Sequence, residues 1–307
     1  MSNRNRNSRD GQLPKSMEPV ELWSDPVDGE ALLTAIRNSL RSYMALPAHA
    51  AETVALWVLH SHCHDVAEHS PILAIQSPEK RCGKTTLLNI LGRLVPVPLP
   101  AANVTTPVIF RAIERFQPTL LLDEVETFIR DNEEMRGVLN SGFTRESAMV
   151  LRCVGDDHEP RPFSTWCPKA GALIGNLPDT LQDRSIVITL RRRLASERSE
   201  RFGRKAHGLM LMLHRQAARW AADNLDMLGV ANDPLMPRGL GDRAEDAWRP
   251  LLTLADAVGG DWPDVARTAA LAISGAMAND ADSQSRGVLL LAHIRELLRT
   301  LDVGSLQ

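Results

Sequence analysis

Residues 72–94 constrain the fold of this chain more than any other stretch of its sequence. Residues 72–76 form an apolar run typical of a buried strand, and residues 84–94 have the periodicity of a helix. The segment between them ends in Gly83-Lys84-Thr85, so the helix opens on a lysine and a threonine. Because backbone N–H groups at the start of such a helix converge on an anion, the sequence predicts a phosphate-binding loop.

Each residue type in this predicted loop suits a nucleotide phosphate. Gly83 lets the backbone approach closely, Lys84 supplies charge to the β- and γ-phosphates, and the Thr85 hydroxyl coordinates Mg²⁺. The loop departs from the pattern G-x-x-x-x-G-K-[ST] at its first position, which is Pro78. That position shapes the turn more than it binds phosphate, although a chance Gly-Lys-Thr is the alternative. The other residues predicted to bind the nucleotide are Glu79, Lys80, Arg81, Cys82 and Thr86.

Two carboxylates follow a second predicted strand. The apolar run at residues 119–122 ends in Asp123-Glu124. In a nucleotide hydrolase the aspartate holds the Mg²⁺ shell, and the glutamate orients and deprotonates water. The alternative is a solvent-capped strand end. Together with the predicted phosphate loop, the pair favours hydrolysis over phosphate transfer by a small-molecule kinase, which needs an acceptor pocket instead.

The order of strand and helix signals predicts four regions. Residues 1–21 are expected to form a flexible polar arm and residues 22–70 a helical preface. Strands alternate with helices over residues 71–195, which predicts an α/β core with a parallel sheet wrapped by helices. Residues 196–302 are predicted to form an all-helical domain, with helices at 197–226, 241–258, 263–278 and 283–301.

Composition excludes several classes of protein. The 307 residues are 44% hydrophobic and 24% charged with a net charge of −3, which excludes a disordered polyelectrolyte and a globally basic DNA-coating protein. The four cysteines form no CxxC pair, as expected in a reducing compartment. Because neither a signal peptide nor a membrane-spanning run is evident, we expect a cytoplasmic protein.

With these motifs, the chain resembles the AAA+ branch of the additional-strand P-loop ATPases. It is more similar still to an uncharacterised ATPase domain family of phage, plasmid and mobile-element primase–helicase proteins. The similarity runs from about Leu22 to about Leu301. It is carried by SPEKRCGKTTLL (77–88), PTLLLDEVETF (118–128), LNSGFTR (139–145), ALIGNLPDTLQDRSIVI (172–188) and GDRAEDAWRPLLTLADAVGGDWP (241–263).

The resemblance implies an AAA+-like core followed by a helical lid domain, with bound ATP and Mg²⁺. It also implies that Asn176, after a predicted strand at 170–174, is the sensor-1 residue that places the attacking water. The alternative for Asn176 is a loop asparagine before Leu-Pro. Arg243 resembles a sensor-2 arginine, for which Arg249 is a competing candidate, and the alternative for Arg243 is a surface ion pair with Glu245 or Asp246.

Arg184 matches the position of an arginine finger in ring ATPases. An arginine finger acts on the nucleotide of a neighbouring subunit, so this match implies a homo-oligomer, of which a ring is one form. The alternative is a helix-end arginine paired with Asp183 or Asp179, and the residues alone leave the two readings even.

Short strands at 148–153 and 162–166 flank Gly-Asp-Asp-His, which predicts a hairpin. In the helicase-related AAA+ proteins that the chain resembles, a hairpin at this point grips DNA. The predicted tip, residues 155–159, is acidic and repels phosphate, and only Arg152 and Arg161 oppose that charge. DNA contact at this hairpin is therefore less favoured than a structural role.

Two further clusters are interpreted as structural. His60, His62, Cys63, His64 and His69 lie close together in the sequence, yet no second cluster completes a zinc site, so a histidine-rich helix is favoured over a metal centre. Residues 191–193 are three arginines that follow the last predicted strand. A solvated linker is favoured there over a nucleic-acid contact.

The sequence leaves three functions open. The first is a DNA-linked helicase or loader ATPase of a mobile element or phage, with a primase or another replication protein as partner. The second is a nucleotide-gated oligomeric scaffold that does not translocate. The third is a small-molecule kinase, against which Glu124, Asn176 and the helical C-terminal part argue.

Overall fold

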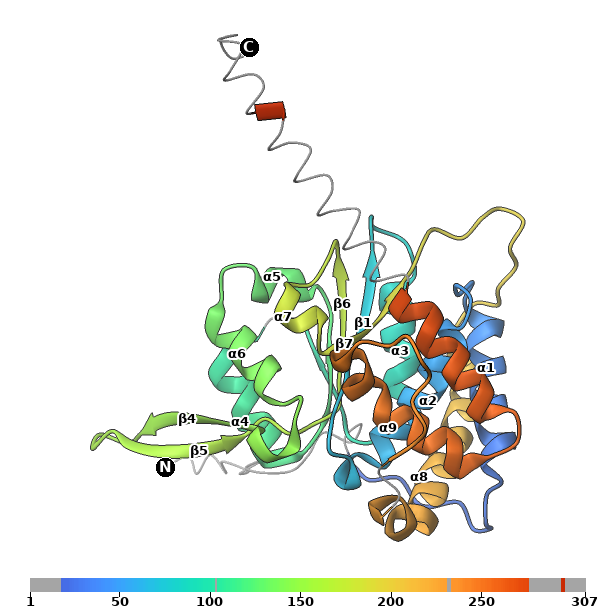
Figure 1. Cartoon of the computed structure of the whole chain (residues 1–307), viewed down its shortest axis with the longest axis horizontal. Helices are drawn as coiled ribbons and strands as arrows, with labels where there is room; N and C mark the ends of the chain where they lie inside the picture. The colour runs from blue at the N-terminus through green and yellow to red at the C-terminus, as the bar shows by residue number, and fades with distance from the viewer. Residues whose placement is uncertain (1–17, 103, 231–232, 276–293, 296–307) are drawn as a thin grey trace, which may run out of the picture.

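A five-stranded parallel sheet forms the centre of the molecule (Figure 1). The computed structural model describes residues 18–102, 104–230, 233–275 and 294–295. The strand order is β2-β3-β6-β1-β7, and every neighbouring pair in this sheet is parallel. The strands are β1 (Ile72–Ser77), β2 (Pro98–Ala101), β3 (Thr119–Leu122), β6 (Lys169–Ile174) and β7 (Ser185–Thr189). The predicted α/β architecture with a parallel sheet is confirmed.

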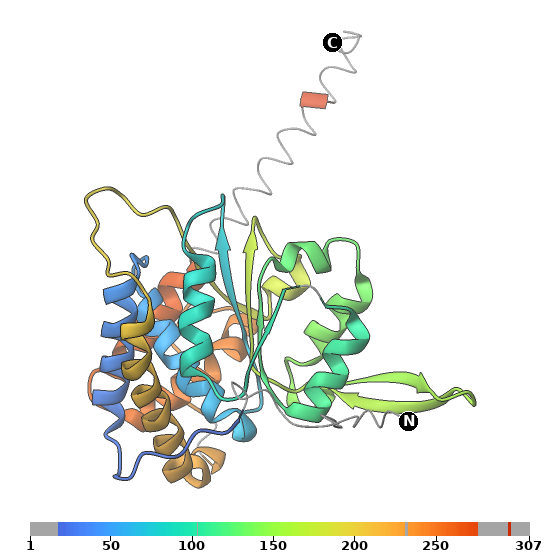
Figure 2. The same cartoon turned by 180° about the vertical axis from the view of Figure 1, so that it is seen from behind.

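Helices cover both faces of the sheet, and β1 shows how the sequence divides between them (Figures 1 and 2). Leu73 and Ile75 belong to one hydrophobic cluster, whereas Ile72 and Ala74 belong to the other. Successive side chains of a strand point to opposite faces, so a strand covered on both sides is apolar throughout. The first face carries α1 (Gly29–Tyr43), α2 (Ala50–His62), α3 (Lys84–Leu94), α8 (His207–Val230), α9 (Asp242–Val258) and a helix at 262–275. The second carries α4 (Thr106–Phe116), α5 (Val125–Ile129), α6 (Glu133–Ser141) and α7 (Asp179–Gln182).

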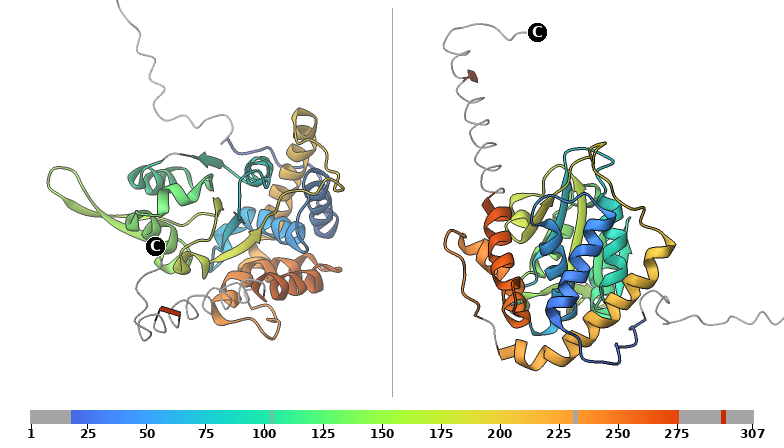
Figure 3. Two further views of the ribbon diagram at one scale, coloured as in Figure 1. Left: turned by 90° about the horizontal axis from the view of Figure 1, so that it is seen from above. Right: turned by 90° about the vertical axis from the view of Figure 1, so that its right-hand side faces the viewer.

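The helices before and after the α/β core pack together in one layer. Trp57 of α2 and Trp248 of α9 are both fully buried in the same cluster as α3 and one face of the sheet. Figure 3 shows this layer beside the sheet, with α1 against α8. The domain boundaries at residues 70 and 195 stay a prediction, while the packing unites the two helical regions.

The predicted hairpin is confirmed and projects from the body of the molecule (Figures 1 and 3). It consists of β4 (Met149–Val154) paired antiparallel with β5 (Glu159–Ser164). Phe163 anchors its base against Phe110 of α4, with 4.8 Å between ring centroids. Such an aromatic contact fixes the hairpin to the second face of the sheet.

The predicted helix at 197–226 begins later than its pattern indicated. After a short 3₁₀ turn at Arg204–Ala206, α8 runs from His207 to Val230. The preceding segment is fixed by other contacts, such as that of Phe202 with Tyr43, whose ring centroids lie 5.4 Å apart. The predicted helix at 283–301 lies outside the described residues except at 294–295, where the backbone is helical. Among the described residues, no helix combines the length and apolar character needed to cross a membrane.

Buried histidines fill the interface between α2, α3 and α8. A ring nitrogen of His62 lies 2.8 Å from the carbonyl oxygen of Leu94, and its ring packs edge-on against His214 at 5.2 Å. Burial lowers the pKa of His60 and of His62 to about 3 and that of His214 to about 4. These rings are therefore neutral at neutral pH and serve as packing groups.

The neutral histidines predict an acid-sensitive fold. Their pKa values in the folded chain lie below the ordinary value, so the unfolded chain binds protons first as the pH falls. The stability they provide is complete above about pH 6.5 and declines below it, by at most about 1.4 kcal/mol per pH unit for each ring. Urea unfolding from about pH 7 to about pH 5 should show this loss. His214→Gln should reduce the slope of unfolding free energy against pH. His158→Asn is the control, at the exposed hairpin tip, and should leave that slope unchanged. An unfolding free energy that does not change between these pH values would contradict the prediction.

Candidate functional site

The carboxyl ends of β1, β3 and β6 meet at one edge of the sheet (Figure 1). This is the edge at which open parallel sheets bind ligands. Three segments leave the sheet there: residues 78–83, called here the β1–α3 loop, the pair Asp123-Glu124 after β3, and Gly175-Asn176 after β6. The topology thus brings three of the predicted motifs to one place.

The β1–α3 loop ends in a helix start that suits an anion. Gly83 precedes α3 with φ of 89°, and no side chain caps the helix. A Cβ atom at Gly83 would lie 3.2 Å from the Met44 methyl group, in a backbone region that disfavours side chains. Arg81 also has a positive φ, 68°, while the buried Cys82 points its thiol toward the Glu79 carbonyl at 3.4 Å. The first N–H groups of α3 are therefore available to an anionic ligand.

Lys84 is held inside the loop by neutral oxygen atoms. Its Nζ donates to Ser77 Oγ at 2.6 Å and to the Glu79 carbonyl oxygen at 3.5 Å. Ser77 Oγ in turn donates to the same carbonyl at 2.7 Å. Within the described part of the chain, no carboxylate forms an ion pair with Lys84. Its charge is thus uncompensated by the protein and suits a phosphate group.

One hydrogen bond joins the loop side of the site to the acidic pair. Thr85 Oγ1, at the start of α3, donates to Asp123 Oδ2 at 3.1 Å. Oxygen atoms of a hydroxyl and a carboxylate are the ligands that Mg²⁺ prefers, so this pair fits a Mg²⁺ ion. Sequence reasoning placed both residues in the metal set, and the structure brings them together.

Glu124 is exposed at the end of β3 in a strained conformation. Its φ is 55°, a left-handed value uncommon for a residue with a side chain. Its N–H donates to Asp123 Oδ1 at 3.1 Å, and its carbonyl accepts from Thr127 Oγ1 at 2.8 Å. Strain of this kind gathers at functional sites, and here the backbone turn separates the two neighbouring carboxylates.

Asn176 leaves the sheet between the loop and the acidic pair. The N–H of Gly175 donates to the Ser77 carbonyl at 3.0 Å, which ties the end of β6 to the end of β1. Since β6 lies between β1 and β3, the exposed Asn176 stands on the same edge as Lys84 and Glu124. Its placement agrees with its predicted role beside the nucleotide, and that role remains a prediction.

Arg184 lies at the opposite edge of the sheet. It precedes β7, whose 5 residues run toward the site edge and span roughly 17 Å. Its Nη1 donates to the Thr180 carbonyl at 2.7 Å, and its guanidinium lies 6.0 Å from the centre of the Phe143 ring. Among the described residues Arg184 forms no ion pair with Asp179 or Asp183, so the ion pair of the alternative reading is absent there, while both readings of Arg184 stay predictions.

Arg243 is exposed on the first turn of α9, and no hydrogen bond or ion pair of the described residues joins it to the β1–α3 loop. Six residues further along α9, Arg249 lines a cavity together with Glu68 and His69, which precede β1. The alternative pairing of Arg243 with a carboxylate of the same helix is also missing from the described ion pairs. The geometry therefore supports neither reading of Arg243.

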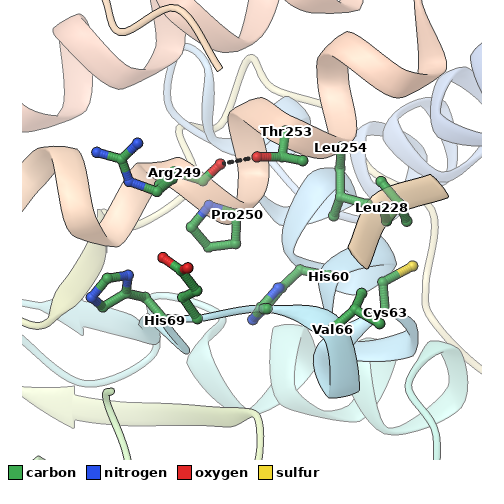
Figure 4. A pocket seen from close by; sticks show the side chains of 11 residues that line it. His60, Cys63, Val66, His69, Leu228, Arg249, Pro250, Thr253 and Leu254 are labelled. Atoms are coloured by element: carbon green, nitrogen blue, oxygen red, sulfur yellow. Dashed lines mark hydrogen bonds between the residues drawn. The ribbon is translucent and has the colours of Figure 1, made fainter. Parts of the chain in front are cut away.

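A small cavity lies beside the buried histidines (Figure 4). Its volume is about 30 Å³, enough for water and far too small for a nucleotide. In the part of the chain that the structure describes, His60 Nε2 and His69 Nδ1 have no hydrogen-bond partner, and both histidines line this space. Among the described residues, no three histidine, cysteine or acidic side chains are arranged to hold a metal ion.

A larger cavity of about 720 Å³ opens beside Thr85 and Asp123. It runs along α3 between the edge strand β2 and α8, and its volume suits a small-molecule ligand. Sequence reasoning missed this cavity, because the helix α8 that closes it follows β2 by about a hundred residues. It also missed Ser77 as the partner of Lys84, although that serine begins the motif at residues 77–88.

Comparisons with known proteins give limited coverage. Residues 189–307 match a family described as "Protein of unknown function (DUF3631)". An "Uncharacterized 28.9 kDa protein in xis 5'region" of Saccharopolyspora erythraea is 42% identical over 83 residues, which are 27% of this chain. The matched residues span only 30% of that curated relative. The family match does not reach the β1–α3 loop or Asp123.

Two solved structures are similar at low TM-scores. A full-length MCM homolog from Methanopyrus kandleri gives a TM-score of 0.48 at 13% identity, covering 84% of this chain and 63% of that one. The C-terminal region of NrS-1 gives 0.39 at 11% identity, covering 69% of this chain and 49% of that one. At these scores the site is interpreted from its own residues.

Proposed function

We propose that this chain is a Mg²⁺-dependent ATP hydrolase of the AAA+-like P-loop type. The observation that carries the proposal is the hydrogen bond from Thr85 to Asp123, which places a Lys-Thr helix start against an acidic pair. Lys84 beside it has no carboxylate partner among the described residues, as a phosphate-binding lysine requires. In hydrolysis the phosphate acceptor is water, so the proposed reaction requires no pocket for a second organic substrate.

Each residue at the site edge has a role in this proposal. Lys84 and the first N–H groups of α3 bind the phosphates, with residues 79–83 and Thr86 around them. Thr85 and Asp123 hold Mg²⁺, which neutralises phosphate charge when bound. Glu124 accepts a proton from the attacking water, and Asn176 orients that water.

The proposed biological setting is the replication of a mobile element or phage. A helicase or loader component of a mobile-element replication system agrees with the motif resemblance and with a relative in a xis 5' region. In that setting the expected partners are DNA and a primase or another replication protein. The chain would assemble as a homo-oligomer such as a ring.

The hairpin favours a second candidate, a nucleotide-gated scaffold. Arg152 pairs with Glu134 at 2.9 Å, and Arg161 pairs with Glu114 at 3.7 Å. Both arginines are thus engaged within the protein, and the tip between the strands carries acidic residues. Stimulation of ATP hydrolysis by single- or double-stranded DNA would favour the helicase or loader, whereas its absence would favour the scaffold.

Lys84→Ala tests the binding site directly. The substitution removes the charge aimed at the phosphates, so ATP affinity should fall by at least about tenfold, or about 1.4 kcal/mol. Lys205→Ala is the matched control, since Lys205 is an exposed lysine outside the β1–α3 loop. Calorimetric titration with Mg²⁺ and ATP measures both variants, and equal binding by Lys84→Ala and the parent chain would end the proposal.

A further inference from the structure

Arg192 reaches the β1–α3 loop from a distant part of the sequence. Its Nη2 lies 2.7 Å from Glu79 Oε2, and its Nε donates to the Lys80 carbonyl at 3.4 Å. The contact follows from the sheet, because β7 lies next to β1 and Leu190 N–H still donates to the Gln76 carbonyl. The chain therefore leaves β7 directly beside the loop.

The turn that presents Arg192 is held by its neighbours. Arg191 donates to both carboxylate oxygens of Glu197, and the N–H of Leu194 donates to Glu197 Oε2 at 2.8 Å. Hydrogen bonds from Arg191 and Leu194 lower the pKa of Glu197 to about 2, so this carboxylate stays ionised at neutral pH. Arg193 points elsewhere, to Ser199 Oγ at 2.6 Å. Of the three consecutive arginines, Arg192 is the one in contact with the loop.

Glu79 is the unusual member of the loop. It is the sole carboxylate in residues 78–86, whereas Lys80, Arg81 and Lys84 are basic. A negative side chain beside an anion site opposes anion binding. Its ion pair with Arg192 compensates that charge.

We propose that Arg192 is a further phosphate-binding residue of the nucleotide site, which exchanges Glu79 for a phosphate group when a nucleoside triphosphate binds. This inference rests on the proposed function of the same loop. The ion pair is solvent-accessible, with side-chain exposures of 55% and 48%, and such pairs are weak and exchange readily. A guanidinium binds phosphate through two parallel hydrogen bonds, a stronger contact than an exposed carboxylate offers.

Two substitutions with opposite expected effects test the exchange. Arg192→Ala should weaken ATP binding by about tenfold, as expected for one lost charge-assisted contact. Glu79→Gln frees Arg192 and should tighten binding by a few-fold. In the Glu79→Gln background, Arg192→Ala should still weaken binding, because the arginine contacts the phosphate itself. The effects should be large for ATP and absent for adenosine, which carries no phosphate.

Arg193→Ala is the matched control, since it removes a neighbouring arginine without a loop contact. Calorimetric titrations of the full chain with ATP and adenosine give the affinities, and thermal unfolding checks that each variant folds. An unchanged affinity of Arg192→Ala, or a loss that vanishes in the Glu79→Gln background, would overturn the exchange. In a further titration with a single-stranded oligonucleotide, a loss of binding by Arg192→Ala without a loss of ATP binding would also overturn the exchange.

The outcomes separate this inference from the proposed function. If the parent chain binds ATP and Lys84→Ala does not, the proposed nucleotide site is supported, whether or not Arg192→Ala changes the affinity. If the parent chain and Lys84→Ala bind ATP equally, the site itself is wrong. Arg192→Lys should restore part of the affinity, because a lysine retains the charge and loses the forked geometry.

Discussion

Arg184→Ala should bind ATP as the parent chain does and hydrolyse it about 10³- to 10⁵-fold more slowly, the range for a lost arginine finger. The structure explains why binding is spared. Arg184 lies at the amino edge of the sheet, roughly 17 Å of strand away from the loop of its own subunit. Its guanidinium can act on a nucleotide only in a neighbouring subunit, so the effect requires an oligomer.

Mixing inactive variants tests this requirement. Lys84→Ala lacks a working phosphate loop and retains Arg184, whereas Arg184→Ala retains the loop. In a mixed oligomer, an intact Arg184 therefore meets an intact loop at some interfaces, and part of the activity should return. Phosphate release is measured for each variant alone and for equal mixtures, after subunit exchange has been verified.

Two results would contradict the trans arrangement: no recovery in mixtures that exchange subunits, and full activity in a strict monomer. Arg184 would then be a structural residue. Its hydrogen bond to the Thr180 carbonyl and its contact with Phe143 would be its whole role.

Glu124→Gln should separate binding from hydrolysis. Glutamine keeps the size and hydrogen bonding of the side chain but cannot accept a proton, so turnover should fall by about 10²- to 10⁴-fold. ATP binding should persist, because Lys84 and Thr85 are unchanged. Among the described residues, the exposed Glu124 side chain makes no hydrogen bond or ion pair that the substitution would break, and the backbone bond from its N–H to Asp123 remains.

Single-turnover phosphate release and an ATP titration measure the two quantities for Glu124→Gln. Glu133→Gln, an exposed carboxylate on α6, is the control and should match the parent chain. If Glu124→Gln turns ATP over at the parental rate, Glu124 is not the base, and a kinase or a passive nucleotide binder becomes the better account.

The sequence predicted the elements nearest to the site most closely. The bounds expected for α3 and β3 are those of the structure, and β1 differs by one residue. Apolar strands buried on both faces carry an unbroken signal, and a glycine followed by a helix marks the loop between them. Asp123 and Glu124 were predictable for the same reason, since they end a strand.

Contacts between distant segments were not predictable from local patterns. The pair of Glu79 with Arg192 joins residues more than a hundred positions apart, and only the neighbouring positions of β1 and β7 bring them together. The start of α8 was placed too early, because residues 197–206 have helix-forming composition while their polar contacts hold an irregular turn. Tertiary contacts override local propensity in such segments.

Phosphate release by the full chain with Mg²⁺ and ATP tests the central claim most directly. The proposed site predicts steady hydrolysis that stops on removal of Mg²⁺, is lost in Lys84→Ala, and falls by at least about 10²-fold in Glu124→Gln. Thermal unfolding of the same preparation must show that each variant is folded. Hydrolysis that persists unchanged in both variants, or a folded parent chain that neither binds nor hydrolyses ATP across protein concentrations, would contradict the account.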